Sequence, residues 1–306
     1  MNILGISCYY HDASACLLKD GKVVAAADEE RFTRIKHDNN FPKNAINYCL
    51  REGKISPKDV DYIGFYEKPI LKFDRVLSQF LETFPGSFRM FIDSMPSWLV
   101  EKLRVPSKLR KELGYEGEIF FIDHHLSHAS SAFLTSPFKR SAILTIDAVG
   151  EWATTSIGLG EGKRIKILKE LRFPHSLGLL YTTVTTYLGF KANNDEYKVM
   201  GLAAYGRPKY YEKFRRLIKI REDGSFHLDM SYFDYQKKLH MFSKKFIEEF
   251  GEERRPGSKI KPRHEDIAAS LQKVTEEVIF KMLNHLHYLT KTENLCMAGG
   301  VALNSM

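Results

Sequence analysis

The 306-residue sequence has only four cysteines, Cys8, Cys16, Cys49 and Cys296, and no two of them stand at a Cys-x-x-Cys spacing. This scarcity argues against a disulfide scaffold, a zinc ribbon and a thiol redox pair, and it favours a reduced, cytoplasmic compartment. No apolar run approaches the roughly 18 residues of a membrane span. The N-terminus also lacks the basic start and apolar core of a secretory signal. We therefore expect neither a leader nor a membrane segment.

Positively charged residues are in modest excess over negatively charged ones. Lys and Arg number 46 against 38 Asp and Glu, so the net charge is +8. Over so long a chain this excess favours acidic partners only weakly. Hydrophobic residues make up 43% and charged residues 27%, which excludes bulk disorder and collagen. The length suits one large domain or two packed halves.

The stretches that begin at Ile3 and Ile143 share one pattern: a β-branched apolar run, a polar loop, a second strand, a Gly-Lys turn and a third strand. The turns are Asp20-Gly21-Lys22 and Glu161-Gly162-Lys163, and Asp-Gly between apolar runs is a good hairpin signal. Chance similarity between two hairpins is the plain alternative. A duplicated unit instead indicates an α/β fold of two lobes like that of the actin/hexokinase/Hsp70 superfamily, in which the two loops clamp a nucleotide.

Other segments fit the same α/β plan. Residues 43–51 are predicted to form a short helix and residues 61–65 a strand. The apolar, β-rich residues 118–122 are predicted to form a central strand. Residues 70–113, rich in Leu, Phe, Lys and Arg and interrupted by prolines, are predicted to form a helical insertion.

The last long pattern is an amphipathic helix over residues 265–286, with apolar residues on one stripe and Asp266 as its N-cap. Together these elements predict a first lobe over residues 1–138 and a second over residues 139–306. The second lobe is expected to be incomplete at its C-terminus.

A histidine pair at metal spacing follows the predicted strand 118–122. His124 and His128 are four residues apart and share one face of a helix, and imidazole suits zinc, iron, copper or nickel. The zinc-protease motif needs a Glu directly after the first His, and His125 stands there, so a peptidase is excluded. Asp147, at the end of the first strand of the second repeat, would complete a two-His-one-carboxylate set. The alternatives are capping or core histidines and a turn-capping Asp.

Four further segments are candidates for ligand contact. His11 lies in the first polar loop and could act as an acid or base, or it is a surface turn histidine. Residues 28–37, which include Lys36, are a solvated strand end or a part of the cleft. The small residues of 195–206 allow close approach of a ligand, or they form a close-packed helix. Gly299-Gly300 at a helix start favours a phosphate or a nucleoside.

Six segments occur in an order and at spacings that resemble one family: YYHDASACLL, EERFTRIKHDNNFP, DHHLSHASSAF, SLGLLYTTVTTYLGF, EYKVMGLAAYG and AGGVALN. They resemble the O-carbamoyltransferases of nodulation-factor and antibiotic biosynthesis. The catalytic domain of that family is similar to the transferases that make threonylcarbamoyladenosine in tRNA. The resemblance covers essentially the whole chain.

The resemblance implies an actin-like catalytic domain with bound Fe(II), although the ligand types also admit zinc. It implies transfer of a carbamoyl group from carbamoyl-adenylate, made from carbamoyl phosphate and ATP, to the hydroxyl of a small-molecule acceptor. His124, His128 and Asp147 would bind the metal. His11 would sit by the carbamoyl group, and Lys36 would contact the adenylate. The expected nucleotide-lining residues are Lys198, Gly201, Gly299, Gly300 and Asn304.

The sequence departs from the family in two ways. Ala148 stands where a Gly usually follows the metal-binding Asp. The family also continues past Met306 with a further acidic metal ligand and a domain that forms carbamoyl-adenylate, so the chain is expected to be a fragment or to have a partner in trans. The alternatives are threonylcarbamoyl transfer to tRNA and a non-catalytic nucleotide-binding module. The residues of the six motifs favour a small-molecule acceptor over nucleic acid. The histidine pair argues against a sugar kinase.

Overall fold

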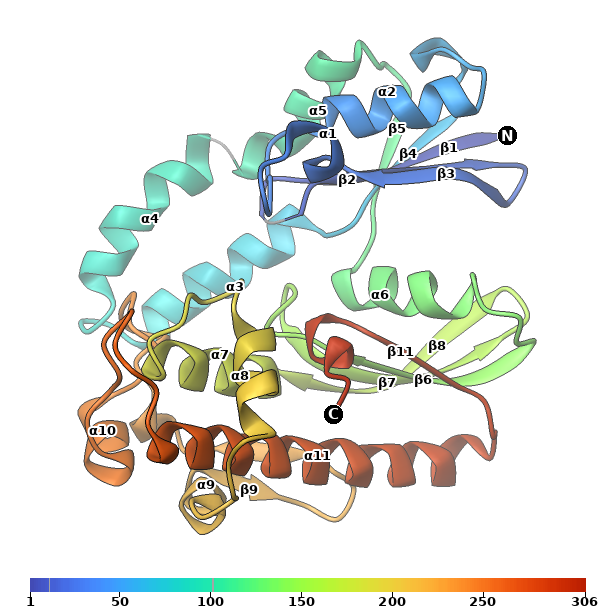
Figure 1. Cartoon of the computed structure of the whole chain (residues 1–306). Coiled ribbons are helices and arrows are strands. Elements are labelled where there is room, and N and C mark those ends of the chain that lie inside the picture. The colour runs from blue at the N-terminus through green and yellow to red at the C-terminus, as the bar shows by residue number, and fades with distance from the viewer. Residues whose placement is uncertain (11, 101) are drawn as a thin grey trace. The chain divides into compact units, whose positions relative to one another are not determined.

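The computed structural model describes residues 1–10, 12–100 and 102–306. These residues divide into two compact units, Met1–Arg75 with Ile92–Ser127 and Val76–Phe91 with His128–Met306. Each unit contains one larger β-sheet covered by helices (Figure 1). The lobe boundary expected at residues 138/139 stays a prediction.

The sheet of the first unit has the strand order β3-β2-β1-β4-β5. β1 pairs antiparallel with β2 and parallel with β4, β2 pairs antiparallel with β3, and β4 pairs parallel with β5. The strands are β1 Asn2–Ser7, β2 Ser14–Lys19, β3 Lys22–Asp28, β4 Tyr62–Phe65 and β5 Glu118–Phe121.

The predicted central strand at residues 118–122 is wrong in its position. β5 is a strand, but among the described residues it lies at the edge of the sheet, and Phe120 is 52% exposed. A short apolar run indicates a strand without telling a central strand from an edge strand, because both can carry apolar side chains.

Helices cover the first sheet and form the adjoining helical region. In α2, Ile46, Cys49 and Leu50 are buried in one core with residues of β1 and β2. Three helices fill the predicted helical segment 70–113, and the division between the units falls within α3 and α4. The helices are α1 Glu30–Thr33, α2 Lys43–Glu52, α3 Pro69–Glu82, α4 Phe88–Val100 and α5 Val105–Leu113, with short 3-10 turns at Pro57–Asp59 and Lys102–Arg104.

The sheet of the second unit repeats the pattern of the first. Its order is β11-β6-β7-β8; β6 pairs antiparallel with β7 and parallel with β11, and β7 pairs antiparallel with β8. β6 thus corresponds to β1, and β11 to β4. This equivalence confirms the duplicated, actin-like α/β fold predicted from the two hairpin repeats. The strands are β6 Arg140–Ile146, β7 Ala153–Glu161, β8 Arg164–Arg172 and β11 Leu295–Ala298.

The two predicted Gly-Lys turns are both two-residue hairpin loops, but they differ in type. Asp20 and Gly21 have φ values of 51° and 79°, as a type I′ turn requires at both central positions. In the second hairpin Gly162, with φ of 61°, stands at the first central position, which is the place of Gly in a type II′ turn. Both turns match the twist of the strands that they connect.

Helices lie on both faces of the second sheet. α6 packs on one face, while α7 and the long α11 pack on the other, and α11 runs along the sheet in Figure 1. No helix in the part of the chain that the structure describes is long and apolar enough to cross a membrane. The remaining elements are α6 His124–Phe133, α7 Leu177–Tyr187, α8 Glu196–Ala203, α9 Tyr211–Leu217, β9 Ile218–Ile220, β10 Phe226–Leu228, α10 Lys244–Phe250 and α11 Pro262–Thr290, with 3-10 turns at Met230–Tyr232 and Gly300–Leu303.

Strand β6 is buried on both faces. Leu144 and Ile146 belong to the core that contains α7 and α11. Ile143, which points to the opposite face, packs with Ala129 and Phe133 of α6. Alternate residues of a strand point to opposite sides, so this one strand forms the centre of the second unit.

The predicted N-cap of the long helix is wrong. α11 begins at Pro262, so Asp266 lies inside the helix, where its carboxylate accepts hydrogen bonds from the Arg207 backbone N–H and the Lys209 Nζ at 2.8 Å each. Proline is well suited to the first helical position because that residue needs no backbone donor. At the third position the His264 Nδ1 accepts the backbone N–H of Lys261 at 3.0 Å.

Because the His264 ring is held in its neutral form, we predict that the folded protein loses stability as the pH falls. Burial, with Arg263, Arg254 and Lys261 nearby, lowers the pKa of His264 from 6.5 to about 4. Its contribution to stability is therefore full above pH 6.5 and is lost as the pH falls towards 4. Glutamine keeps the capping acceptor without titrating. Relative to His264→Gln, we expect the wild type to lose about 1–2 kcal/mol of unfolding free energy over this range, measured by urea denaturation. A constant difference between the two proteins across these pH values would contradict this assignment.

Candidate functional site

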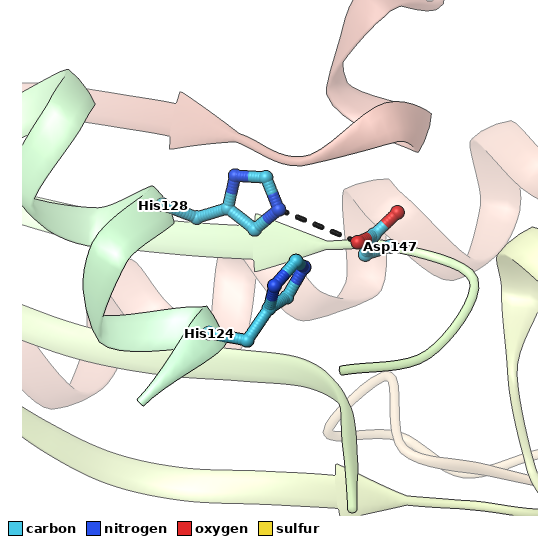
Figure 2. Close-up of side chains that lie close together, drawn as sticks. All are labelled: His124, His128 and Asp147. Atoms are coloured by element: carbon cyan, nitrogen blue, oxygen red, sulfur yellow. Dashed lines mark hydrogen bonds and ion pairs between the residues drawn. The ribbon is translucent and has the colours of Figure 1, made fainter. Parts of the chain in front are cut away.

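Helix α6 carries the two predicted metal-binding histidines. His124 is its first residue and His128 lies one turn later on the same face (Figure 2). Because both residues belong to this one helix, its backbone sets the spacing between them. The helix start is held by Asp123, whose carboxylate pairs with Lys68 Nζ at 2.8 Å and whose carbonyl accepts the Ser127 N–H.

Asp147, the first residue after β6, faces these histidines. Its Oδ2 lies 3.3 Å from His128 Nε2, and one ligand atom from each of His124, His128 and Asp147 falls within 4.8 Å of the others. In Figure 2 both rings point towards the carboxylate. The side chains of His128 and Asp147 are 28% and 19% exposed, so an ion bound there would be partly shielded from water.

The chemistry of this donor set fits a transition metal. Ligand atoms about 2.0–2.2 Å from a common ion lie roughly 3–3.5 Å from one another, so small side-chain rotations would bring the three atoms into that range. Two imidazoles and one carboxylate that leave coordination positions open are typical of non-haem Fe(II) sites, and zinc accepts the same ligand types. The structure thus brings together the three residues that were predicted as metal ligands.

The predicted nucleotide turn lies beside the same carboxylate. β6 and β11 are parallel neighbours with Thr145 opposite Ala298, so the residues that follow the two strands meet at one edge of the sheet. Gly299 has φ of 96°, and a Cβ there would collide with the carbonyl oxygen of Ile146. A Cβ on Gly300 would lie 3.1 Å from Asp147 Oδ1. Gly299 is therefore needed for this close approach, and a side chain on Gly300 would contact the Asp147 carboxylate tightly.

Of the other predicted nucleotide residues, Asn304 directly follows that turn, while Lys198 and Gly201 lie in α8. The Ser305 N–H points at Met200 Sδ of α8 at 3.3 Å, which joins α8 to the C-terminal turn. Asn304 exchanges amide hydrogen bonds of 2.9 and 3.0 Å with Gln272 of α11. In α8, Lys198 pairs with Asp195 at 2.7 Å, a hydrogen bond that raises the Lys198 pKa. A side chain on Gly201 would meet open space.

Of the two predicted catalytic residues, His11 lies outside the described residues and Lys36 is an exposed residue of a turn. The segments around them are joined by hydrogen bonds. The Tyr9 N–H donates to Asn39 O and the Ala13 N–H to Asp38 O, both at 2.7 Å. The first polar loop is therefore attached on both sides to the chain that immediately follows Lys36.

One polar cluster of the first unit was not expected from the sequence. Asp12, Glu30 and His37 each offer a ligand atom within 4.8 Å of the others. Their own hydrogen bonds account for this arrangement, since His37 Nδ1 lies 2.7 Å from Asp12 Oδ1 and the His37 N–H donates to Glu30 Oε2 at 2.9 Å.

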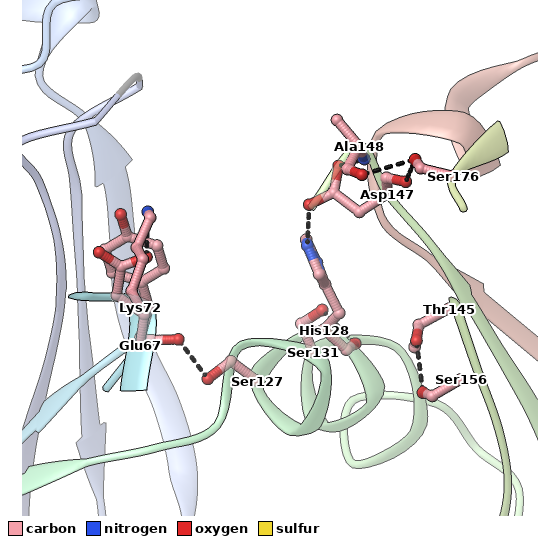
Figure 3. Close-up of polar contacts among 11 residues, drawn as sticks. Glu67, Lys72, Ser127, His128, Ser131, Thr145, Asp147, Ala148, Ser156 and Ser176 are labelled. Atoms are coloured by element: carbon pink, nitrogen blue, oxygen red, sulfur yellow. Dashed lines mark hydrogen bonds and ion pairs between the residues drawn. The ribbon is translucent and has the colours of Figure 1, made fainter. Parts of the chain in front are cut away.

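A small pocket lies where β1 and β4 end, the place in the first unit that corresponds to the Asp147 edge in the second. Cys8, Tyr10 and Trp98 line it together with a buried ion pair between Glu67 and Lys72, which are 2.6 Å apart (Figure 3). Lys72 Nζ also lies 4.2 Å from the centre of the Tyr10 ring. The pocket therefore adjoins the first polar loop, with both of its buried charges already paired.

Two residues that support Asp147 were missed from the sequence. The Ser176 Oγ accepts the Leu179 N–H as N-cap of α7 and donates to Ala148 O at 2.6 Å (Figure 3). A Cβ on Gly178 would lie 2.6 Å from the Ala148 nitrogen. Serine before an apolar run signals an N-cap, but nothing in the sequence shows that this cap contacts a loop 28 residues earlier.

The duplicated sheets place the chain in the actin-like class of α/β proteins, here with a two-histidine, one-aspartate cluster. The chain belongs to the carbamoyltransferase N-terminus family, whose family model matches residues 2–306.

Curated relatives agree with this membership. The uncharacterized protein sll1178 of Synechocystis sp. is 51% identical over 99% of this chain and 51% of its own length. The nodulation protein NolNO of Sinorhizobium fredii is 36% identical over 97% of this chain and 41% of its own length. The chain thus spans about half the length of the relatives that it matches.

Solved structures resemble the chain more distantly. Component A of (R)-2-hydroxyglutaryl-CoA dehydratase from Acidaminococcus fermentans has a TM-score of 0.46 at 13% identity, and the match covers 99% of this chain and 85% of that one. The ROK hexokinase from Thermus thermophilus has a TM-score of 0.36 at 14% identity, with 100% and 84% covered.

The two predicted ligand glycines provide a matched pair of substitutions. Gly299→Ala would force a side chain against backbone at positive φ, so we expect a loss of about 1–3 kcal/mol in unfolding free energy. Gly201→Ala, in open space inside α8, should be neutral or stabilising by up to about 1 kcal/mol. Urea denaturation of both variants measures the difference. Equal stability of the two variants would show that the Gly299 turn is not constrained as described.

Proposed function

We propose that this chain carries the carbamoyl-transfer site of an O-carbamoyltransferase. The reaction would move a carbamoyl group from carbamoyl-adenylate, made from carbamoyl phosphate and ATP, to the hydroxyl of a small-molecule acceptor. The observation that carries the proposal is the meeting of His124, His128 and Asp147 beside the Gly299-Gly300 turn. Membership of the carbamoyltransferase family supports the proposal. The arrangement itself also supports it, because metal ligands and a Gly-rich turn at one sheet edge suit an adenylated carbamate.

We assign the metal-binding role to His124, His128 and Asp147, with Fe(II) as the ion and zinc as the alternative. An ion bound there would supply Lewis-acid polarisation of phosphate or carbamoyl oxygens. We assign the nucleotide-orienting role to Gly299, Gly300, Lys198, Gly201 and Asn304. Residues that follow parallel strands at one sheet edge are where open α/β sheets bind their ligands.

In the transfer step the acceptor oxygen would form a bond to the carbamoyl carbon. The bond between that carbon and the phosphate oxygen would break, and AMP would leave. We assign to His11 the role of general base, which removes the proton from the attacking hydroxyl. Lys36 is assigned to the adenylate phosphate, whose negative charge a lysine can neutralise. The hydrogen bonds of residues 9 and 13 to residues 39 and 38 support this pairing, since they join the two segments.

The metal assignment predicts binding of about one Fe(II) per chain after anaerobic reconstitution. His128→Ala should lose most of the bound iron, because the ion would keep only two of the three protein ligands described here. His287→Ala removes an exposed imidazole elsewhere in the second unit and is the matched control. Iron is measured by elemental analysis after gel filtration. The assignment is wrong if His128→Ala and His287→Ala retain equal iron.

The activity is tested with freshly prepared carbamoyl-adenylate, the iron-loaded chain and a panel of hydroxylated acceptors, with AMP measured by chromatography. We expect AMP release that requires both metal and acceptor. His11→Ala should lower the rate about 100-fold or more, as loss of a general base does, whereas the exposed Lys22→Ala should not. The proposal would be contradicted if AMP release did not depend on the acceptor and were equal in His11→Ala and the unsubstituted chain. Modification of tRNA in place of small acceptors would favour the threonylcarbamoyl branch of the superfamily.

A further inference from the structure

We propose that Ser176 is a positioning residue for Asp147 and so sets the affinity of the metal site. This inference rests on the proposed metal-binding role of Asp147. Ser176 is fully buried, and its hydroxyl is the polar link between the first turn of α7 and the loop that follows β6.

The Ser176 hydroxyl contacts both peptide groups that flank the Cα of Ala148. It donates to the Ala148 carbonyl at 2.6 Å and lies 3.3 Å from the Asp147 carbonyl oxygen (Figure 3). It also accepts the Leu179 N–H at 3.0 Å. One side chain therefore joins the helix start to the backbone of the ligand-bearing residue.

The carboxylate of Asp147 depends on that same backbone. Its Oδ1 accepts the Ala148 N–H at 2.8 Å, while Oδ2 faces His128 Nε2 at 3.3 Å. A rotation of the peptide between Asp147 and Ala148 would release Oδ1 and turn Oδ2 away from the histidine. Holding this peptide in place therefore orients the carboxylate towards the metal position.

Gly178 is a second, independent observation of the same packing. A Cβ there would lie 2.6 Å from the Ala148 nitrogen and 2.7 Å from the Asp147 carbonyl carbon. These distances are too short for any side chain, so α7 packs directly on the peptide that Ser176 contacts. The first turn of α7 thus limits movement of the loop by shape as well as by hydrogen bonding.

A capping role alone would give a different result. An N-cap contributes about 0.5–2 kcal/mol to stability wherever its helix lies, without a specific effect on a metal site. Ser243 provides the matched control, because it caps α10 by accepting the Phe246 N–H and also donates to a carbonyl, that of Ser231 at 2.7 Å. Ser243→Ala removes the same pair of interactions without touching the Asp147 loop.

The experiment is an anaerobic titration of the full chain with Co²⁺, followed by the visible d–d absorption of the bound ion. All proteins carry His37→Gln, which removes the imidazole of the separate Asp12, Glu30 and His37 cluster. We expect Ser176→Ala to raise the Co²⁺ dissociation constant about 10-fold or more and to alter the spectrum, as loss of outer-shell support does. Ser243→Ala should leave both unchanged, and Ser176→Thr, which keeps the hydroxyl, should bind within about threefold of the parent.

The outcomes separate the two proposals. If His128→Ala binds Co²⁺ as the parent does, the metal site itself is wrong and the proposed function fails. If His128→Ala loses the ion but Ser176→Ala binds as tightly as Ser243→Ala, the metal site stands and the positioning role of Ser176 is overturned. Should Ser176→Ala not fold, Ser176→Cys replaces the hydroxyl by a weaker donor of similar size. Parent-like affinity in Ser176→Cys would then overturn the inference.

Discussion

Burial of strand β6 on both faces is the constraint on which the second unit depends. Residues on one side meet α7 and α11, while Ile143 on the other meets Phe133 of α6. A side chain on Gly160 of the neighbouring β7 would collide with the Phe133 ring, so a small residue is needed where the helix approaches. Close packing of this kind leaves little freedom for α6 to rotate. The face of α6 that carries His128 is thereby held towards the end of β6.

The candidate site is a consequence of parallel strand ends. β6 and β11 run side by side, and each is followed directly by a residue that matters: Asp147 in one case and the Gly299-Gly300 turn in the other. The chain between them is more than 140 residues long, yet the sheet brings its two ends together. The start of α7 also contacts this edge, because the Ser176 hydroxyl donates to the Ala148 carbonyl. The edge at which these residues meet thus arises from topology, and its chemistry comes from a few side chains placed there.

Local patterns were the most predictable part of this fold. Apolar runs ending at turn residues located most strands within a few residues, and the i, i+4 spacing of His124 and His128 identified one helical face correctly. Neighbours in the sheet and helix starts were less predictable. The apolar pattern of residues 118–122 predicts a central strand, whereas β5 lies at the edge of the described sheet. Asp266 looked like an N-cap, but it binds Arg207 and Lys209 from within α11, and such tertiary partners leave no local pattern.

The repeated strand pattern, the helical face with two histidines and the family motifs could be read from the amino-acid order alone, because each depends on residues close together in the chain. Three arrangements instead depend on folding: Asp147 reaches that histidine pair, the Gly299-Gly300 turn lies against its carboxylate, and Ser176 and Gly178 hold its backbone. These contacts join residues far apart in sequence. They form because close packing and the pairing of buried polar groups leave the folded chain few alternatives.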